Sequence, residues 1–73
     1  MIPGPSIEVR LNGKSREIPE GLTLLGLLKH LEIKQDRVAI EFNREIVKAE
    51  LWGSTPIHAG DELEVVHFVG GGR

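Results

Sequence analysis

Residues 7–31 read IEVRLNGKSREIPEGLTLLGLLKHL, and this stretch decides the fold because the period of its apolar residues changes along it. Apolar and charged residues alternate over residues 7–11, which is the period of a half-buried strand. Asn12-Gly13 follows, a dipeptide typical of two-residue hairpin turns because both residues tolerate a positive φ. Residues 14–18 are the expected return strand, which Pro19 and the turn-forming Glu20-Gly21 end.

The second half of the stretch has the period of a helix. One helical face collects four leucines: Leu24, Leu27, Leu28 and Leu31. Thr23 is the expected N-cap, and Lys29 and His30 complement the helix dipole at the other end. Gly26 costs about 1 kcal/mol of helix propensity relative to alanine. We expect this glycine because it would let the helix backbone lie close against a sheet.

The remainder of the chain predicts three more strands and no second long helix. Strands are expected over residues 38–42, 45–47 and 62–69, with a turn at Asn43-Arg44 and a connector over residues 48–56. One helix on one face of a mixed sheet of four or five strands is the economical way to bury these apolar faces. This is the α+β, ubiquitin-like β-grasp architecture, and its right-handed crossover makes the first and last strands parallel central neighbours.

Length and composition predict a single domain. The chain has 73 residues, no cysteine and a net charge of −2, with 40% hydrophobic and 27% charged residues. We expect one β-grasp domain over residues 1–69, with a loose leader at 1–5 and a flexible tail at 70–73. The charge argues against a nucleic-acid partner, and no apolar run is long enough to span a membrane. A cytoplasmic protein is the expectation.

No group of residues in the sequence has the pattern of an active site. His30, His58 and His67 fit no metal-ligand spacing, so no metal site is expected. Glu62 and Glu64 alternate on the last strand and are read as solvated surface. The final glycines are not a phosphate loop, because neither a lysine nor a helix follows them. The chain is therefore not expected to be an enzyme.

The end of the chain is its most unusual feature. A strand rich in valine and phenylalanine runs directly into Gly70-Gly71-Gly72-Arg73. If the alternation of the last strand turns Leu63 and Val65 toward the helix, Val66 and Phe68 lie on the opposite face. An apolar face beside a thin glycine tail is typical of a surface that docks a partner.

Three segments together resemble the ThiS family, the small sulfur carriers of thiamine biosynthesis. They are residues 38–47, Trp52, and residues 60–72, which read GDELEVVHFVGGG. The Asn12-Gly13 hairpin and the leucine-rich helix agree with this resemblance.

The resemblance implies that the C-terminal carboxyl of Gly72 is the working group. An E1-like enzyme would use ATP and magnesium to adenylate it, and the chain itself would bind no cofactor. Sulfur transfer would then give a thiocarboxylate that donates sulfur to thiazole synthase. Gly70 and Gly71 would thread the partner's channel, and Val66 and Phe68 would dock. Extended, residues 69–72 would reach roughly 13–14 Å from the fold.

Arg73 departs from the family pattern, in which the mature chain ends in glycine. Three explanations stay open: a peptidase removes Arg73, the partner tolerates it, or it is an artificial addition. Two alternative functions also stay open. One is the small subunit of molybdopterin synthase, a related sulfur carrier, although residues 66–69 lack the prolines expected there. The other is a β-grasp interaction module whose tail carries no chemistry.

Overall fold

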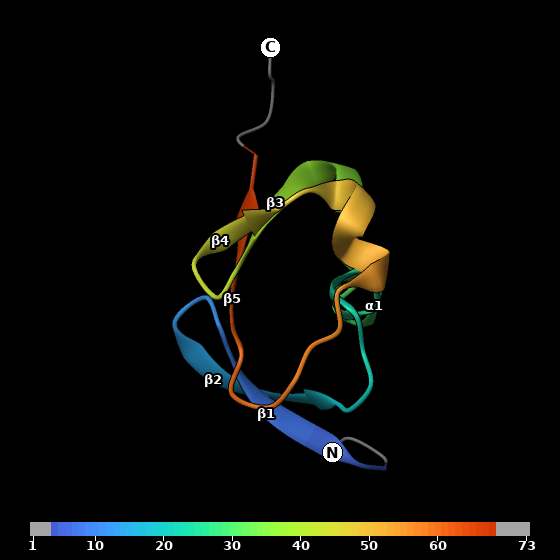
Figure 1. Cartoon of the computed structure of the whole chain (residues 1–73), viewed down its shortest axis with the longest axis vertical. Coiled ribbons are helices and arrows are strands. Elements are labelled where there is room, and N and C mark those ends of the chain that lie inside the picture. The colour runs from blue at the N-terminus through green and yellow to red at the C-terminus, as the bar shows by residue number, and fades with distance from the viewer. Residues whose placement is uncertain (1–3, 69–73) are drawn as a thin grey trace.

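A mixed sheet of five strands forms the body of the protein, in a computed structural model that describes residues 4–68. The elements in chain order are β1 (Ser6–Leu11), β2 (Lys14–Pro19), α1 (Leu24–His30), the 3-10 turn η1 (Gln35–Arg37), β3 (Val38–Phe42), β4 (Glu45–Val47), the 3-10 helix η2 (Ala49–Ser54) and β5 (Glu62–His67). The strand order is β2-β1-β5-β3-β4 (Figure 1). β1 and β5 are parallel neighbours, and the other neighbouring pairs are antiparallel. The predicted β-grasp architecture is confirmed.

Both predicted hairpin turns pass through residues with positive φ, a conformation that the sequence predicts for Asn12-Gly13. The φ angles are 53° at Asn12 and 81° at Gly13 in the β1–β2 turn. In the β3–β4 turn they are 50° at Asn43 and 73° at Arg44. Two successive left-handed residues match the right-handed twist of the flanking strands. Arginine is an uncommon choice there, because its Cβ is disfavoured in the left-handed region.

The helix α1 begins after Thr23, its predicted N-cap. The Thr23 hydroxyl accepts a hydrogen bond from the Gly26 amide at 3.1 Å. At the other end, the Ile33 amide donates to the Leu28 carbonyl at 2.9 Å, which closes a Schellman motif. The three leucines at positions 24, 27 and 28 are fully buried, whereas Leu31 is only partly buried.

The expected reason for Gly26 is wrong. A Cβ at this position would lie 3.3 Å from Leu22 Cδ2 and 3.5 Å from Thr23 Oγ1, and no sheet atom is among its near neighbours. The glycine makes room for the leucine that precedes the helix and for the capping hydroxyl. The atoms that leave no room for a Cβ at Gly26 therefore belong to the residues at the start of the helix and not to the sheet.

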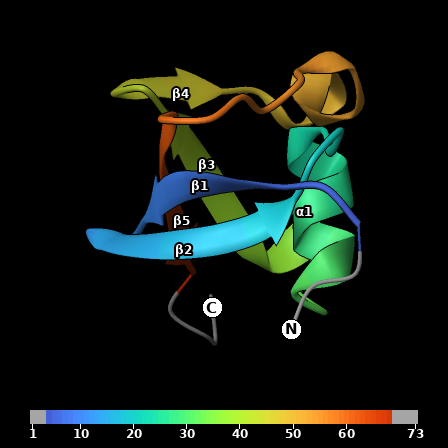
Figure 2. The same cartoon turned by 90° about the horizontal axis from the view of Figure 1, so that it is seen from below.

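The hydrophobic core lies between α1 and one face of the sheet (Figure 2). Besides the three helix leucines it contains Val9, Ile18, Val38, Ile40, Trp52, Ile57, Leu63 and Val65. Trp52 and Ile57 were not predicted as core residues. Trp52, on η2, is 2% exposed, and its indole N–H donates to the Val47 carbonyl at 2.8 Å. The connector after β4 thus closes one end of the core.

The limits of the domain stay a prediction in part. The structure describes the expected leader only from Gly4 onward, and residues 69–73 lie outside the described range, so the boundary between residues 69 and 70 is not tested. Within the described range, none of the helices has the length and apolar character needed to cross a bilayer.

Candidate functional site

The face of the sheet opposite α1, here called the open face, carries the two predicted docking residues. Val66 and Phe68 are 53% and 60% exposed, while Leu63 and Val65 on the other face are 1% and 6% exposed. The alternation predicted for the last strand is confirmed. Exposed apolar side chains of this size are candidates for anchoring an interface. The docking role itself stays a prediction.

The open face has a charged half next to this apolar end. Glu64 on β5 is paired with Glu41 on the neighbouring strand β3, and Glu41 is paired with Ile46 on β4. A hollow on this face is lined by Gly13, Glu41, Arg44, Glu62, Leu63 and Glu64. Arg44 Nε lies 3.8 Å from Glu62 Oε1, an exposed ion pair that contributes little to stability. Glu62 and Glu64 are surface residues, as predicted.

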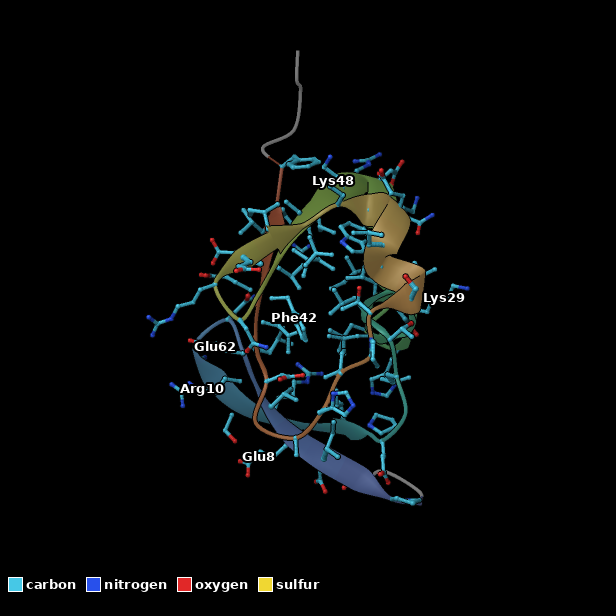
Figure 3. The ribbon with its side chains drawn as sticks, in the orientation of Figure 1. Glu8, Arg10, Lys29, Phe42, Lys48 and Glu62 are labelled. Atoms are coloured by element: carbon cyan, nitrogen blue, oxygen red, sulfur yellow. The ribbon has the colours of Figure 1, made fainter. Side chains whose placement is uncertain are left out.

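The part of the open face formed by β1, on the other side of β5 from β3, is also polar. Glu8 and Arg10 project outward from β1, whereas Phe42 points to the interior (Figure 3). Arg10 Nη2 donates to the Gly13 carbonyl at 2.9 Å, which links the strand to its own turn. Along β5 the open face therefore changes from charged at Glu62 to apolar at Phe68.

Two turn asparagines hold β5 in place, a feature that the sequence reasoning missed. Asn12 Oδ1 accepts from the Val65 amide at 2.8 Å, and the Asn12 amide donates to the Leu63 carbonyl at 2.9 Å. Asn43 Oδ1 accepts from the Glu62 amide at 2.9 Å. Each asparagine thus serves both its turn and the strand that leads into the tail. The only signal in the sequence was that both two-residue turns begin with asparagine.

The side chain of Asn12 replaces a main-chain hydrogen-bond acceptor beyond the end of β1. In a continued parallel ladder, the main-chain carbonyl of residue 12 would accept from Val65, but the chain turns away there. The side-chain oxygen takes that position. Asn12 therefore extends the pairing of β5 by one hydrogen bond past the end of β1.

This arrangement predicts how three variants of Asn12 rank in stability. Asn12→Gly keeps the positive φ but leaves the Val65 amide without its acceptor, so we expect a loss of about 1–2 kcal/mol. Asn12→Ala adds the cost of a left-handed alanine, about 1 kcal/mol more. Asn12→Asp keeps an acceptor and should lose least. Urea unfolding measures all three, and equal losses for the Asp and Gly variants would show that the hydrogen bond to β5 does not matter.

The three histidines all lie within the part of the chain that the structure describes. Among residues 4–68, no group of three or more histidine, cysteine or acidic side chains is placed to hold a metal ion. His30 is in the last turn of α1, as predicted, and His67 is exposed at the end of β5. Gly70, Gly71 and Gly72, the predicted tail residues, lie outside the described residues together with Arg73.

Comparison with known proteins decides the family. A model of the ThiS family matches residues 9–72, which include both turn asparagines and the whole of β5. The chain belongs to the ThiS family. The match continues through the glycines to residue 72 and leaves out Arg73.

Relatives of the ThiS family match the chain over most of its length. The sulfur carrier protein ThiS of Bacillus subtilis is 34% identical over 65 residues, 88% of this chain and 98% of that protein. The crystal structure of the thiamine biosynthesis protein ThiS from Geobacter metallireducens has a TM-score of 0.79 and 32% identity. It covers 90% of this chain and 100% of the other.

A larger enzyme also contains a segment similar to this chain. A thiazole synthase of Magnetococcus marinus is 37% identical over 67 residues, which are 92% of this chain but 21% of that protein. The chain therefore spans about a fifth of the length of this relative.

Proposed function

We propose that this protein is a sulfur carrier for thiazole formation in thiamine biosynthesis and that the carboxyl of Gly72 carries the sulfur. The family match, which extends to residue 72, is the observation that supports this most. The Bacillus subtilis sulfur carrier, aligned over 98% of its length, supports it further. In this proposal the chain is a co-substrate of partner enzymes and not an enzyme itself.

The proposed chemistry proceeds in two displacements. A carboxylate oxygen of Gly72 attacks the α-phosphorus of ATP, and pyrophosphate leaves to give an acyl-adenylate. A sulfur nucleophile from a sulfur donor then attacks the acyl carbon, and AMP leaves. With a persulfide as the donor, this attack gives an acyl disulfide. A thiol then attacks the sulfur that belongs to the donor, which releases the thiocarboxylate and leaves the donor joined to the thiol in a new disulfide. The negative charge of the triphosphate has to be offset by magnesium and by cations of the E1-like partner.

The activating step has a direct test. A chain ending at Gly72 should support exchange of labelled pyrophosphate into ATP with its E1-like partner, because adenylation is reversible. A chain ending at Gly71 should not support it at the same rate. If the partner is active with its own carrier but neither chain supports exchange, the adenylation proposal is wrong.

Val66 and Phe68 are proposed to dock the partner. Phe68→Ser should weaken binding of the E1-like enzyme about 30-fold, because burying a phenyl ring contributes about 2 kcal/mol. The free energy of unfolding should stay nearly unchanged, since the side chain is 60% exposed. Leu51→Ser is the matched control, because Leu51 is 50% exposed but lies on η2, away from β5. Titration calorimetry measures both, and equal affinities for the two variants would contradict docking through Phe68.

Thiazole synthase is proposed as the acceptor of the sulfur. The thiazole synthase of Magnetococcus marinus carries a segment similar to this chain, which supports an association between the two kinds of protein. The large subunit of molybdopterin synthase is the alternative acceptor. Binding measurements with both proteins distinguish the two acceptors. A stable complex with the large subunit of molybdopterin synthase alone would indicate that the chain supplies sulfur for molybdopterin and not for thiazole.

Arg73 has to be absent from the reacting form. Acyl transfer demands tight placement of the reacting atoms, and an additional arginine would displace the Gly72 carboxyl. We propose either that a peptidase removes Arg73 or that this residue is an artificial addition. Protein isolated from its natural host should have the mass of a chain ending at Gly72. A host protein that retains Arg73 and still forms a thiocarboxylate would favour tolerance instead.

A further inference from the structure

The central strand β5 is paired along different lengths on its two sides. On the β3 side, pairing runs from Leu63 to His67. On the β1 side, it stops at Leu63, and the side chain of Asn12 adds one hydrogen bond at Val65. Figure 1 shows β5 continuing beyond the β1–β2 hairpin while still beside β3. The second half of this central strand is therefore an edge of the sheet.

The free groups on this edge follow from the hydrogen-bond pattern. The N–H and C=O of one strand residue point to the same side, and successive residues alternate. Leu63 and Val65 bond toward β1 and Asn12, while Glu62 and Phe68 bond toward β3. The Val65 carbonyl and both main-chain groups of His67 thus point to the side where β1 has ended. Among residues 4–68, no turn, loop or side-chain hydrogen bond to these three groups is present, and the alternation set by the bond from the Phe68 amide to the Arg37 carbonyl places none of them on the β3 side.

The outer strands of the sheet carry features that block pairing, and residues 65–68 carry none of these features. β2 carries the charges of Lys14, Arg16 and Glu17 and ends in a proline, and β4 has only three residues. Charged side chains, proline and short length are the usual means of blocking an edge strand. Residues 65–68 read VVHF, with neither lysine, glutamate nor proline. An unblocked edge is typical of a strand that accepts another strand.

We propose that the Val65–His67 edge accepts an extended strand of the E1-like enzyme that receives Gly72, an inference that rests on the proposed function. The groups without a partner among residues 4–68 are one donor and two acceptors, which a peptide backbone satisfies. The same enzyme would cover Val66 and Phe68 on the adjoining open face, so that the edge continues that interface. A second copy of the chain is a poorer occupant, because so short an edge buries far less than the roughly 1,200 Å² of a stable interface.

Amide hydrogen exchange of the complex, read residue by residue by NMR, tests the proposal. In the free protein, the Val65 and Phe68 amides are hydrogen-bonded and serve as internal controls. The His67 amide should exchange fast in the free protein and at least about tenfold more slowly in the complex. An unchanged rate at His67 in a saturated complex would overturn the proposal. Slowing of this amide with concentration of the free protein, without the enzyme, would indicate a second copy and overturn it also.

A pair of variants at His67 separates the main chain from the side chain. His67→Pro removes the N–H, and proline is tolerated at a strand edge. It should weaken binding of the enzyme about 3- to 10-fold, the contribution of one hydrogen bond, whereas His67→Ala should bind nearly as the wild type. Equal effects of the two variants would overturn the proposal. At saturating enzyme the proline variant should still be adenylated, and if even the wild type is not, it is the proposed function that fails.

Discussion

Replacing Gly71 with valine is expected to reduce adenylation of Gly72 at least about 100-fold, in a chain that ends at Gly72. The reason is that the tail is proposed to thread a channel that has no room for a Cβ. Even a small misplacement of the carboxyl relative to the α-phosphorus costs about two orders of magnitude in rate. The rate of pyrophosphate exchange at saturating enzyme measures this effect directly.

Two controls show whether the loss comes from threading. Gly71→Ala carries a single methyl group and should be intermediate between glycine and valine. The affinity of the valine variant for the enzyme should fall far less than its rate, because the docking proposed for Val66 and Phe68 does not involve residue 71. The free energy of unfolding should not change, since the last core residue of the described range is Val65, six positions earlier in the chain. A valine variant that exchanges pyrophosphate at the wild-type rate would contradict the threading role.

Trp52→Ala is expected to destabilise the fold by about 3–5 kcal/mol. The indole is 2% exposed within the core, and its N–H donates to the Val47 carbonyl at 2.8 Å. Its removal leaves a cavity in the core next to η2 and also a carbonyl without its donor. A small domain has a total stability of about 5–15 kcal/mol, so this loss is a large part of the total. Urea unfolding followed by circular dichroism gives the measurement.

Trp52→Phe separates packing from hydrogen bonding. Phenylalanine fills much of the space but cannot donate to Val47, so we expect a loss of about 1–3 kcal/mol. Leu51→Ser, at the exposed neighbour, should change stability by less than about 0.5 kcal/mol. An alanine variant as stable as the phenylalanine variant would show that Trp52 does not support the core.

The strands and the helix could be predicted from the sequence because each has a clear period. Alternation at residues 7–11 and 38–42 indicates strands, and the leucine spacing indicates the helix. Asn12-Gly13 predicts its turn because of its local backbone preference. One helix and a handedness rule then leave few ways to order the strands. These are local signals combined with one general rule of topology.

Contacts between distant residues could not be predicted in this way. Asn12 bonds to Val65 across 53 residues, and nothing near either residue indicates that pairing. Trp52 lies in an irregular connector without period, so its burial has no signature in the sequence. Gly26 had a plausible but wrong explanation, because propensity shows that a glycine is costly and not which atom it avoids. The exposure of Val66 and Phe68 followed from strand alternation, whereas the partner proposed for them rests only on the family.

The most direct test of the central claim is mass spectrometry that locates the sulfur. A chain ending at Gly72 is incubated with its E1-like enzyme, ATP, magnesium and a sulfur donor, and the intact mass is compared before and after. We predict an increase equal to the replacement of one oxygen by sulfur, and fragmentation should place it on residue 72. An unchanged mass with an enzyme proven active, or sulfur located on any other residue, would contradict the claim that the Gly72 carboxyl is the sulfur carrier.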